Sequence, residues 1–102
     1  MLQQWVLLVQ NEGELAQQDA DGRVPVMARA GNAQTYLLVF KDLVKARKFA
    51  ATSALEGAEP RMVVRSNQDA IVRIARSAGV VSTMLDYDPA TQNYATTSAL
   101  PN

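Results

Sequence analysis

A compact apolar run near the start of the chain constrains the fold more than any other feature. From Gln4 to Val9 the sequence reads Gln-Trp-Val-Leu-Leu-Val, without the alternation of polar and apolar residues that marks a strand with one face in water. The run therefore predicts a central strand that is buried on both faces. It is far too short for a membrane span or a secretion signal, and no basic residue precedes it. We expect neither a targeting signal nor a membrane anchor.

Two later segments have the residue spacing of amphipathic helices. Asp42 is a suitable N-cap for a helix that runs to about Ser53, with small apolar residues on one face and lysines on the opposite face. Ser66 and Asp69 match the start box of a second helix, and Gly79 is suited to its left-handed end. We expect the second helix to be the better defined of the two.

The remaining apolar and β-branched segments predict further strands. These are Val24–Arg29, Thr35–Phe40, Arg61–Arg65, Val80–Leu85 and, as an extra terminal strand, Gln92–Thr97. The first two predict a hairpin, in which Pro25 restricts the first strand to a strand start or a sheet edge. The last two predict another hairpin with its turn at Asp88-Pro89, and we expect the residues from Ser98 onward to fray. The polar, acidic segment Asn11–Gly22 predicts a long loop.

These elements predict an α+β fold and a single domain over residues 1–102. The length of 102 residues suits one hydrophobic core, and an apolar fraction of 48% is ordinary for a globular protein. We expect a mixed β-sheet of about five to six strands with two amphipathic helices packed on it. The chain order is β-β-β-α-β-α-β, with the possible extra strand at the C-terminal end.

The order of these elements and two short signatures resemble a known family. Tyr36 to Phe40 leads directly into the first helix, and the apolar run after Gly79 ends at Asp88-Pro89. Over roughly residues 5–89 the pattern is similar to the N-terminal domain of the SseB-type family, whose members carry Phe-Thr-Ser and Asn-Pro at these two places. Here Lys41-Asp42 stands in place of Thr-Ser. The resemblance implies a bacterial protein that is associated with secretion and protein interaction.

The chain contains no histidine and no cysteine. It therefore lacks the side chains most used for proton transfer at neutral pH, for thiolate chemistry and for binding zinc or copper. Neither the G-x-G-x-x-G motif nor a P-loop is present. We expect no cofactor and no metal, and an enzyme is the less favoured class. A chain without cysteine also fits the reducing cytoplasm, where we expect the protein to reside.

Charge is distributed unevenly along a chain whose net charge is zero. All ten lysines and arginines lie between Arg23 and Arg76, against four acidic residues in the same segment. If both helices pack on the same side of the sheet, their basic side chains form a candidate surface for an anion or a partner. The candidates are Lys41, Lys45, Lys48, Arg73 and Arg76. The neutral total argues against nucleic acid as the partner.

Four residues near the last predicted turn are candidates for exposed contacts: Asp86, Tyr87, Asp88 and Tyr94. Two positions apart in a strand, Asp86 and Asp88 share a face, a geometry that can hold a hard cation or form an acid and base pair. Aspartate is equally favoured in turns, and no third carboxylate is near in sequence. We therefore assign these residues to contacts and not to catalysis.

Two classes of function remain open. The first is a small non-enzymatic protein-interaction module that associates with itself, with a homodimer as the default symmetry, because terminal strands can leave a sheet edge unpaired. The second is a small-molecule or anion-binding domain, including a histidine-independent enzyme. We favour the first class, with a protein or a second copy of the chain as partner and no membrane involved.

Overall fold

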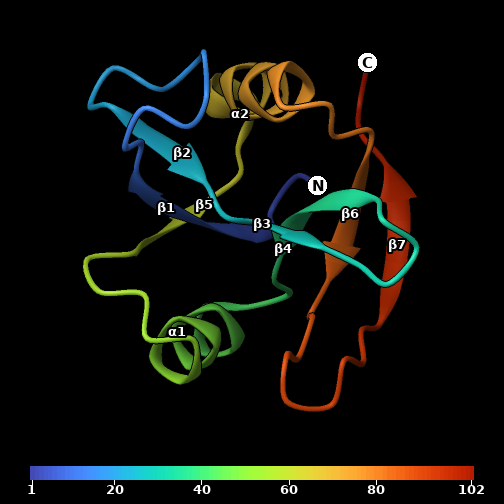
Figure 1. Cartoon of the computed structure of the whole chain (residues 1–102). Helices are drawn as coiled ribbons and strands as arrows, with labels where there is room; N and C mark the ends of the chain where they lie inside the picture. Colours follow the sequence, from blue (N-terminus) through green and yellow to red (C-terminus); the bar gives the residue numbers. More distant parts are fainter.

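The chain forms seven strands and two helices in the computed structural model, which describes all of residues 1–102 (Figure 1). The strands are β1 (Trp5–Gln10), β2 (Arg23–Pro25), β3 (Met27–Arg29), β4 (Thr35–Val39), β5 (Glu59–Met62), β6 (Ser82–Leu85) and β7 (Thr96–Ala99), and the helices are α1 (Leu43–Thr52) and α2 (Arg65–Ser77). The expected α+β fold is confirmed, but there are seven strands where we expected five or six. Neither helix has the length and the apolar composition that crossing a membrane requires.

Hydrogen bonding divides the strands into a three-stranded sheet, in the order β2-β1-β5, and a four-stranded sheet, in the order β3-β4-β6-β7. β1 pairs on both sides, so the prediction of a central strand is confirmed. In the second sheet β4 and β6 are parallel, whereas the other two pairs are antiparallel. The mixed character that we expected is therefore present in the four-stranded sheet.

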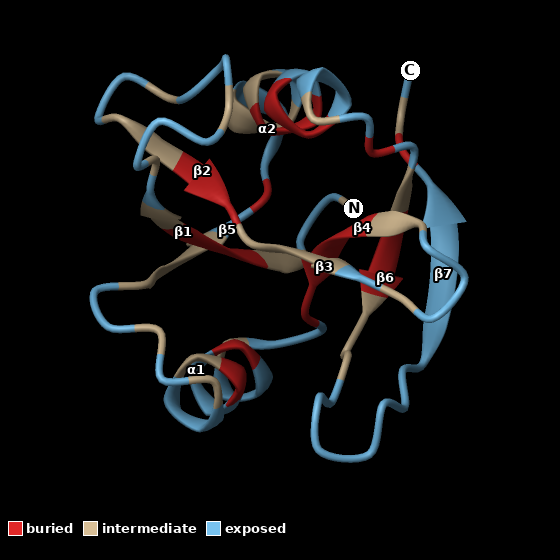
Figure 2. Ribbon diagram, viewed as in Figure 1, coloured by how far each residue is buried: buried red, intermediate tan, exposed pale blue.

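The helices cover opposite faces of the strands, with α2 above and α1 below in Figure 1. This arrangement follows from side chains that alternate along β1. Val6 and Leu8 join a core beneath α2, which we call the α2-side core, whereas Leu7 joins the α1-side core. All three are buried, because each face of the strand has its own helix (Figure 2). β4 alternates in the same way, with Leu37 on the α2 side and Leu38 on the α1 side.

The two sheets meet at a junction of three strands. β2 and β3 are successive parts of one extended segment that is interrupted at Val26. The Val26 N–H donates to the Leu7 carbonyl (2.8 Å), and the Val26 carbonyl accepts from the Leu38 N–H (3.2 Å). Trp5 and Phe40 close the junction by exchanging two backbone hydrogen bonds of 2.8 Å each. The segment therefore pairs first with β1 and then with β4, which is why one expected strand forms two.

The first helix follows the prediction closely. The Asp42 side chain accepts a hydrogen bond from the Lys45 N–H (2.9 Å), so Asp42 is the N-cap that we expected. Ala46 and Phe49 are the buried residues of this helix. The Phe49 ring lies 5.3 Å from the Phe40 ring, centroid to centroid, at a tilt of 49°. This tilted aromatic contact fixes α1 against the end of β4.

The second helix begins earlier than expected, and a different side chain closes its first turn. The N-cap is Val64 instead of Ser66, so the expected start box is wrong. The Asn67 Oδ1 atom accepts a hydrogen bond from the Val64 N–H (2.9 Å), and the Asn67 Nδ2 atom donates to the Met62 carbonyl (2.9 Å). Asn67 therefore fastens the end of β5 to α2. The expected left-handed residue after the helix, Gly79, is confirmed by its φ of +83°.

The strands β5 and β6 lie close to their expected places. β5 covers Glu59–Met62 where we expected Arg61–Arg65, because Val63 is buried in the α2-side core and the next residue begins the turn into α2. β6 covers the second part of the expected Val80–Leu85 segment. Both differences shorten a strand at the point where the chain meets α2.

The C-terminal end is ordered where we expected fraying. Ser98 and Ala99 belong to β7, which pairs antiparallel with β6, so the last hairpin is confirmed. Its second strand begins at Thr96, later than expected. Leu100 packs into the α2-side core with 5% of its surface exposed. The Arg76 guanidinium donates to the carbonyl of Pro101 (2.8 Å). Burial of Leu100 and the hydrogen bond from Arg76 together hold the terminal segment in place.

A group of charged side chains ties β2 to β5 across β1. The Arg23 side chain is 16% exposed, and its guanidinium donates to Glu59 (2.8 Å) and to Asp21 (3.2 Å). Glu59 also accepts a hydrogen bond from Arg61 (2.6 Å). The Asp19 carboxylate accepts from the Arg23 N–H (2.8 Å). The acidic loop after β1 is thus fixed to the edge of the sheet by its own carboxylates.

We expect the contribution of Glu59 to stability to depend on pH. The hydrogen bond from Arg61 lowers the pKa of Glu59; partial burial opposes this effect, and the Arg23 charge adds to it. Because the folded-state pKa is lowered, the stabilisation is present above the unfolded-state pKa and is lost as pH falls through the folded-state value. At pH 7, Glu59→Gln should therefore unfold at a lower temperature than the unchanged chain, and the difference should close as pH falls below the usual glutamate pKa of about 4.3 and through the lowered folded-state pKa.

Thermal unfolding followed by circular dichroism, at several pH values, measures this effect. Glu14→Gln is the matched control, because Glu14 is exposed in the acidic loop and forms no ion pair. A difference between Glu59→Gln and the unchanged chain that persists undiminished at about pH 2 would show that the carboxylate charge is not responsible.

Candidate functional site

The carboxyl ends of the parallel strands β4 and β6 lie side by side at one end of the four-stranded sheet. β4 leads through Phe40 into α1, and β6 leads into a turn that begins at Asp86. The Asp86 N–H donates to the Val39 carbonyl (2.9 Å), and the Asp86 Oδ1 atom accepts from the Lys41 N–H (2.9 Å). Asp86 has a φ of +56°, a left-handed conformation that aspartate tolerates better than most residues. This residue therefore fixes the turn against the start of α1.

A second turn follows directly. The Asp88 side chain accepts a hydrogen bond from the Ala90 N–H (3.0 Å), and the Asp88 N–H donates to the Asn93 carbonyl (2.8 Å). The Gln92 N–H donates to the Asp88 carbonyl (2.7 Å). Aspartate before proline thus forms the turn that the sequence predicts, and the segment from Asp86 to Ala90 has a defined shape.

A groove of about 690 Å³ opens between α1 and this segment. The α1 wall consists of Lys45, Lys48 and Thr52, and the facing wall consists of residues 86–90. Aromatic rings complete the lining: Phe40, Phe49 and Tyr87. The two phenylalanines are almost wholly buried, so they form the floor of the groove, and the partly exposed Tyr87 offers the accessible aromatic surface.

The two walls carry opposite charges that do not pair with each other. Every salt bridge of the structure involves Arg23 or Arg61, and neither residue lines the groove. Lys45 and Lys48 on α1 therefore have no carboxylate within salt-bridge distance, and the aspartates of the facing wall have no basic side chain. A ligand that carries both signs of charge can satisfy both walls at once.

Five of the residues singled out from the sequence meet at this groove: Lys45, Lys48, Asp86, Tyr87 and Asp88. Lys41 lies at its end, where its backbone N–H bonds to Asp86. Tyr94 is 51% exposed, in the loop before β7 and outside the groove lining. Phe49 and Thr52 also line the groove and were not singled out from the sequence; the helical spacing of Thr52 with Lys45 and Lys48 was the available signal.

The condition for a common basic surface on the two helices is not met. Arg73 and Arg76 belong to α2, which lies on the opposite face of the sheet from α1 and its lysines (Figure 1). Arg76 also donates to the carbonyls of Leu100 and Pro101, at 3.5 and 2.8 Å. This arginine holds the end of the chain, and the basic residues of the two helices are separate surfaces.

The acidic residues of the groove have the geometry of turns. The Asp86 and Asp88 carboxylates each accept a hydrogen bond from a backbone N–H, and no group of three or more acidic side chains in the structure has an arrangement that could hold a metal ion. The arrangement therefore offers charge and hydrogen-bond acceptors to a bound group, in the manner of a recognition surface.

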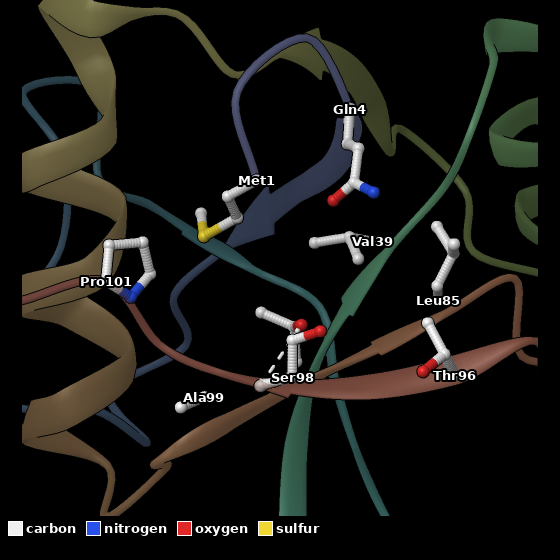
Figure 3. A pocket seen from close by; sticks show the side chains of 9 residues that line it. Met1, Gln4, Val39, Leu85, Thr96, Ser98, Ala99 and Pro101 are labelled. Atoms are coloured by element: carbon white, nitrogen blue, oxygen red, sulfur yellow. Dashed lines mark hydrogen bonds between the residues drawn. The ribbon is translucent and has the colours of Figure 1, made fainter.

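A second, smaller cavity of about 80 Å³ lies on the α2 side of the four-stranded sheet (Figure 3). Its lining includes Gln4, Val39, Leu85, Thr96 and Ser98. A water molecule occupies about 30 Å³ of liquid volume, so the cavity has room for about two or three waters, and it is well below the roughly 300 Å³ of the smallest usual small-ligand sites. The groove beside α1 is the larger and more accessible of the two sites.

We expect substitutions at Asp86 to show that its hydrogen bond and its tolerance of positive φ together stabilise the turn. Asp86→Ala should lower the free energy of unfolding by about 1–2 kcal/mol, because it removes the bond to the Lys41 N–H and places an alanine at positive φ. Asp86→Asn retains an acceptor and tolerates this φ, so it should cost less than half as much. Urea denaturation measures both values. Equal losses in the two variants would show that neither effect operates at this position.

Comparisons with protein-family models, with curated proteins and with solved structures find no match to this chain. The resemblance to the SseB-type family therefore stays a prediction from the sequence. The geometry of the groove and of the sheet edges is the basis for a functional assignment.

Proposed function

We propose that the chain is a small non-enzymatic protein-interaction module, which associates with itself and receives an extended segment of a partner protein in the groove beside α1. The observation that carries the docking proposal is the pair of oppositely charged walls on either side of an aromatic floor. In keeping with a chain that lacks cysteine, we propose the cytoplasm of a bacterium as its setting. The resemblance to a family associated with secretion and protein interaction points the same way.

The length of the groove suits a short stretch of extended chain. From Lys45 to Thr52 the α1 wall runs for about 10 Å at about 1.5 Å per helical residue. An extended peptide advances about 3.3 Å per residue, so about three residues span this wall. Neighbouring side chains of an extended peptide point to opposite sides. An acidic residue next to a basic one therefore reaches both walls, with its carboxylate near Lys45 and Lys48 and the cation near Asp88.

The aromatic residues of the lining, Tyr87 above all, add apolar contact to this charge pattern. Phe49 and Tyr87 come from different elements and line the same groove. Aromatic surface of this kind is common at interaction sites, because a ring gives a large contact area with little loss of side-chain freedom. The aliphatic parts of a bound acidic and basic side chain can lie against these rings. We therefore expect the partner segment to have an apolar residue on one or both sides of the charged pair.

A second candidate function, a small-molecule or anion-binding domain, is favoured by one observation. The groove volume of about 690 Å³ lies within the range of about 300–1,000 Å³ that is usual for small-ligand sites. The same two walls would then hold a small zwitterion, or the lysines alone would hold an anion. Titration with free glutamate and with inorganic phosphate distinguishes this candidate from peptide docking.

We expect a peptide with adjacent charges of opposite sign to bind at the groove. The probe is Ac-Leu-Glu-Lys-Leu-NH2, added to the ¹⁵N-labelled chain while the amide signals are followed by NMR. Saturable shifts should appear at Lys45, Lys48 and residues 86–90. The uncharged peptide Ac-Leu-Gln-Gln-Leu-NH2 should bind about tenfold more weakly, since about 1.4 kcal/mol is a reasonable total for two exposed ion pairs.

Charge reversal of the α1 wall tests the location of binding. The double variant Lys45→Glu with Lys48→Glu should abolish the preference for the charged peptide. Arg73→Glu is the control, because it makes the same kind of change on α2, at the opposite face of the sheet. Groove shifts with glutamate or phosphate but not with the peptide would select the second candidate. No groove shift with any probe at about 5 mM would contradict both.

A further inference from the structure

β7 forms the outer edge of the four-stranded sheet, and all four of its residues are exposed (Figure 2). The Leu100 N–H donates to the Val81 carbonyl (2.9 Å), which sets the hydrogen-bonding phase of the β6–β7 pair. Antiparallel pairs exchange hydrogen bonds at every second residue, so the backbone N–H and carbonyl groups of Ser98 point toward β6. The backbone N–H and carbonyl groups of Thr97 and Ala99 consequently point away from the sheet.

The three-stranded sheet is protected at both edges. On β5 the Val63 N–H donates to the Gln4 carbonyl (2.8 Å), so Val63 is a residue whose backbone groups bond to β1. By the same alternation, the backbone groups of Pro60 point away from β1. Proline has no N–H to donate to another strand. On β2 the backbone groups of Arg23 and Pro25 point away from β1, and Pro25 is buried. The neighbouring outward carbonyl, that of Arg23, accepts the Asp19 N–H (2.8 Å). Proline and loop coverage are established means of blocking pairing between chains.

The far edge of the four-stranded sheet is blocked less completely. β3 has three residues, and Arg29 is exposed at its end with its side chain donating to the Ala33 carbonyl (3.3 Å). A very short strand with a charged residue also resists pairing. β7 differs from all of these edges, because Thr96-Thr97-Ser98-Ala99 contains neither a proline nor a charge. It is the one strand edge of this protein that carries no protective feature.

We propose that β7 pairs antiparallel with β7 of a second copy of the chain, so that two four-stranded sheets become one continuous eight-stranded sheet. The inference gives the self-associating part of the proposed function a surface and a partner, and it rests on that part alone. A two-fold axis at Ser98 places Thr97 of each copy opposite Ala99 of the other. Each of these two pairs exchanges two backbone hydrogen bonds, and the outward groups of β7 are all satisfied.

The side chains of β7 suit pairing of a strand with itself. Across a two-fold axis a charged residue meets its own copy or lies close to it, and like charges at such positions repel. β7 has no charge. Ser98 lies opposite Ser98 of the second copy, at the closely spaced non-hydrogen-bonded position, where a small side chain fits. Tyr94, two residues before β7, is half exposed.

The interface is small, so we expect a reversible equilibrium. Sedimentation velocity should show monomers at about 10 µM and dimers predominating at about 1 mM protein, as is usual for short strand pairings at the low end of interface size. Amide hydrogen exchange provides a residue-specific measurement. The Thr97 and Ala99 amides should exchange slowly at high protein concentration and quickly on dilution, whereas the Ser98 amide should be protected at both.

Charge substitution at the two-fold axis tests the register. Ser98→Lys alone and Ser98→Glu alone should stay monomeric, because like charges then face each other across the axis. An equimolar mixture of the two variants should dimerise at least as strongly as the unchanged chain. Thr91→Lys, at the exposed tip of the hairpin, is the control and should dimerise normally. Ala99→Pro removes one outward N–H without adding charge and should also weaken the dimer.

Circular dichroism and the two-dimensional NMR spectrum establish that each variant is folded. A chain that stays monomeric at about 1 mM would overturn the inference, and so would a dimer that Ser98→Lys and Ala99→Pro leave intact. Slow exchange at Thr97 and Ala99 that does not depend on concentration would overturn it as well. The peptide titration of the groove is unaffected by any of these outcomes, so failure of one proposal is distinguishable from failure of the other.

Discussion

Burial of β1 and β4 on both faces is the constraint on which the rest of the structure depends. Val6, Leu7 and Leu8 follow one another along β1 and alternate between the two cores, so neither face of the strand can be left in water. One helix must therefore cover each face. With the faces occupied, the surfaces that remain for recognition are the ends of the strands and their edges, and the groove and β7 lie at these two places.

Features set by neighbouring residues could be predicted from the sequence. The Asp42 cap, the turn at Asp88-Pro89 and the left-handed Gly79 each depend on one or two local hydrogen bonds or on one backbone conformation. Features set by distant contacts could not. That β7 is ordered instead of frayed depends on burial of Leu100 in the α2-side core. The start of α2 depends on the hydrogen bond that the Asn67 side chain donates to Met62 in β5. The spacing of neighbouring residues does not indicate contacts between residues that are distant in the sequence.

The candidate site divides in the same way. Helical spacing indicated Lys45 and Lys48. The position of Asp86 and Asp88 beside a predicted turn indicated these two aspartates. That these two sets form the walls of one groove depends on the parallel pairing of β4 with β6, strands that are separated by two helices and a further strand. The same long-range topology places Arg73 of α2 on the far side of the sheet, away from the lysines.

The prolines of β2 and β5 have a consequence for the size of any assembly. A sheet with two available margins can recruit a new molecule at each of them, and such growth has no natural end; this is how filaments form. In this protein Pro25 and Pro60 block the two edges of the three-stranded sheet, and the short β3 with its exposed Arg29 resists pairing at the far edge of the four-stranded sheet. If β7 pairs with a second copy as proposed, no unprotected edge is left for a third molecule, so this arrangement disfavours polymerisation.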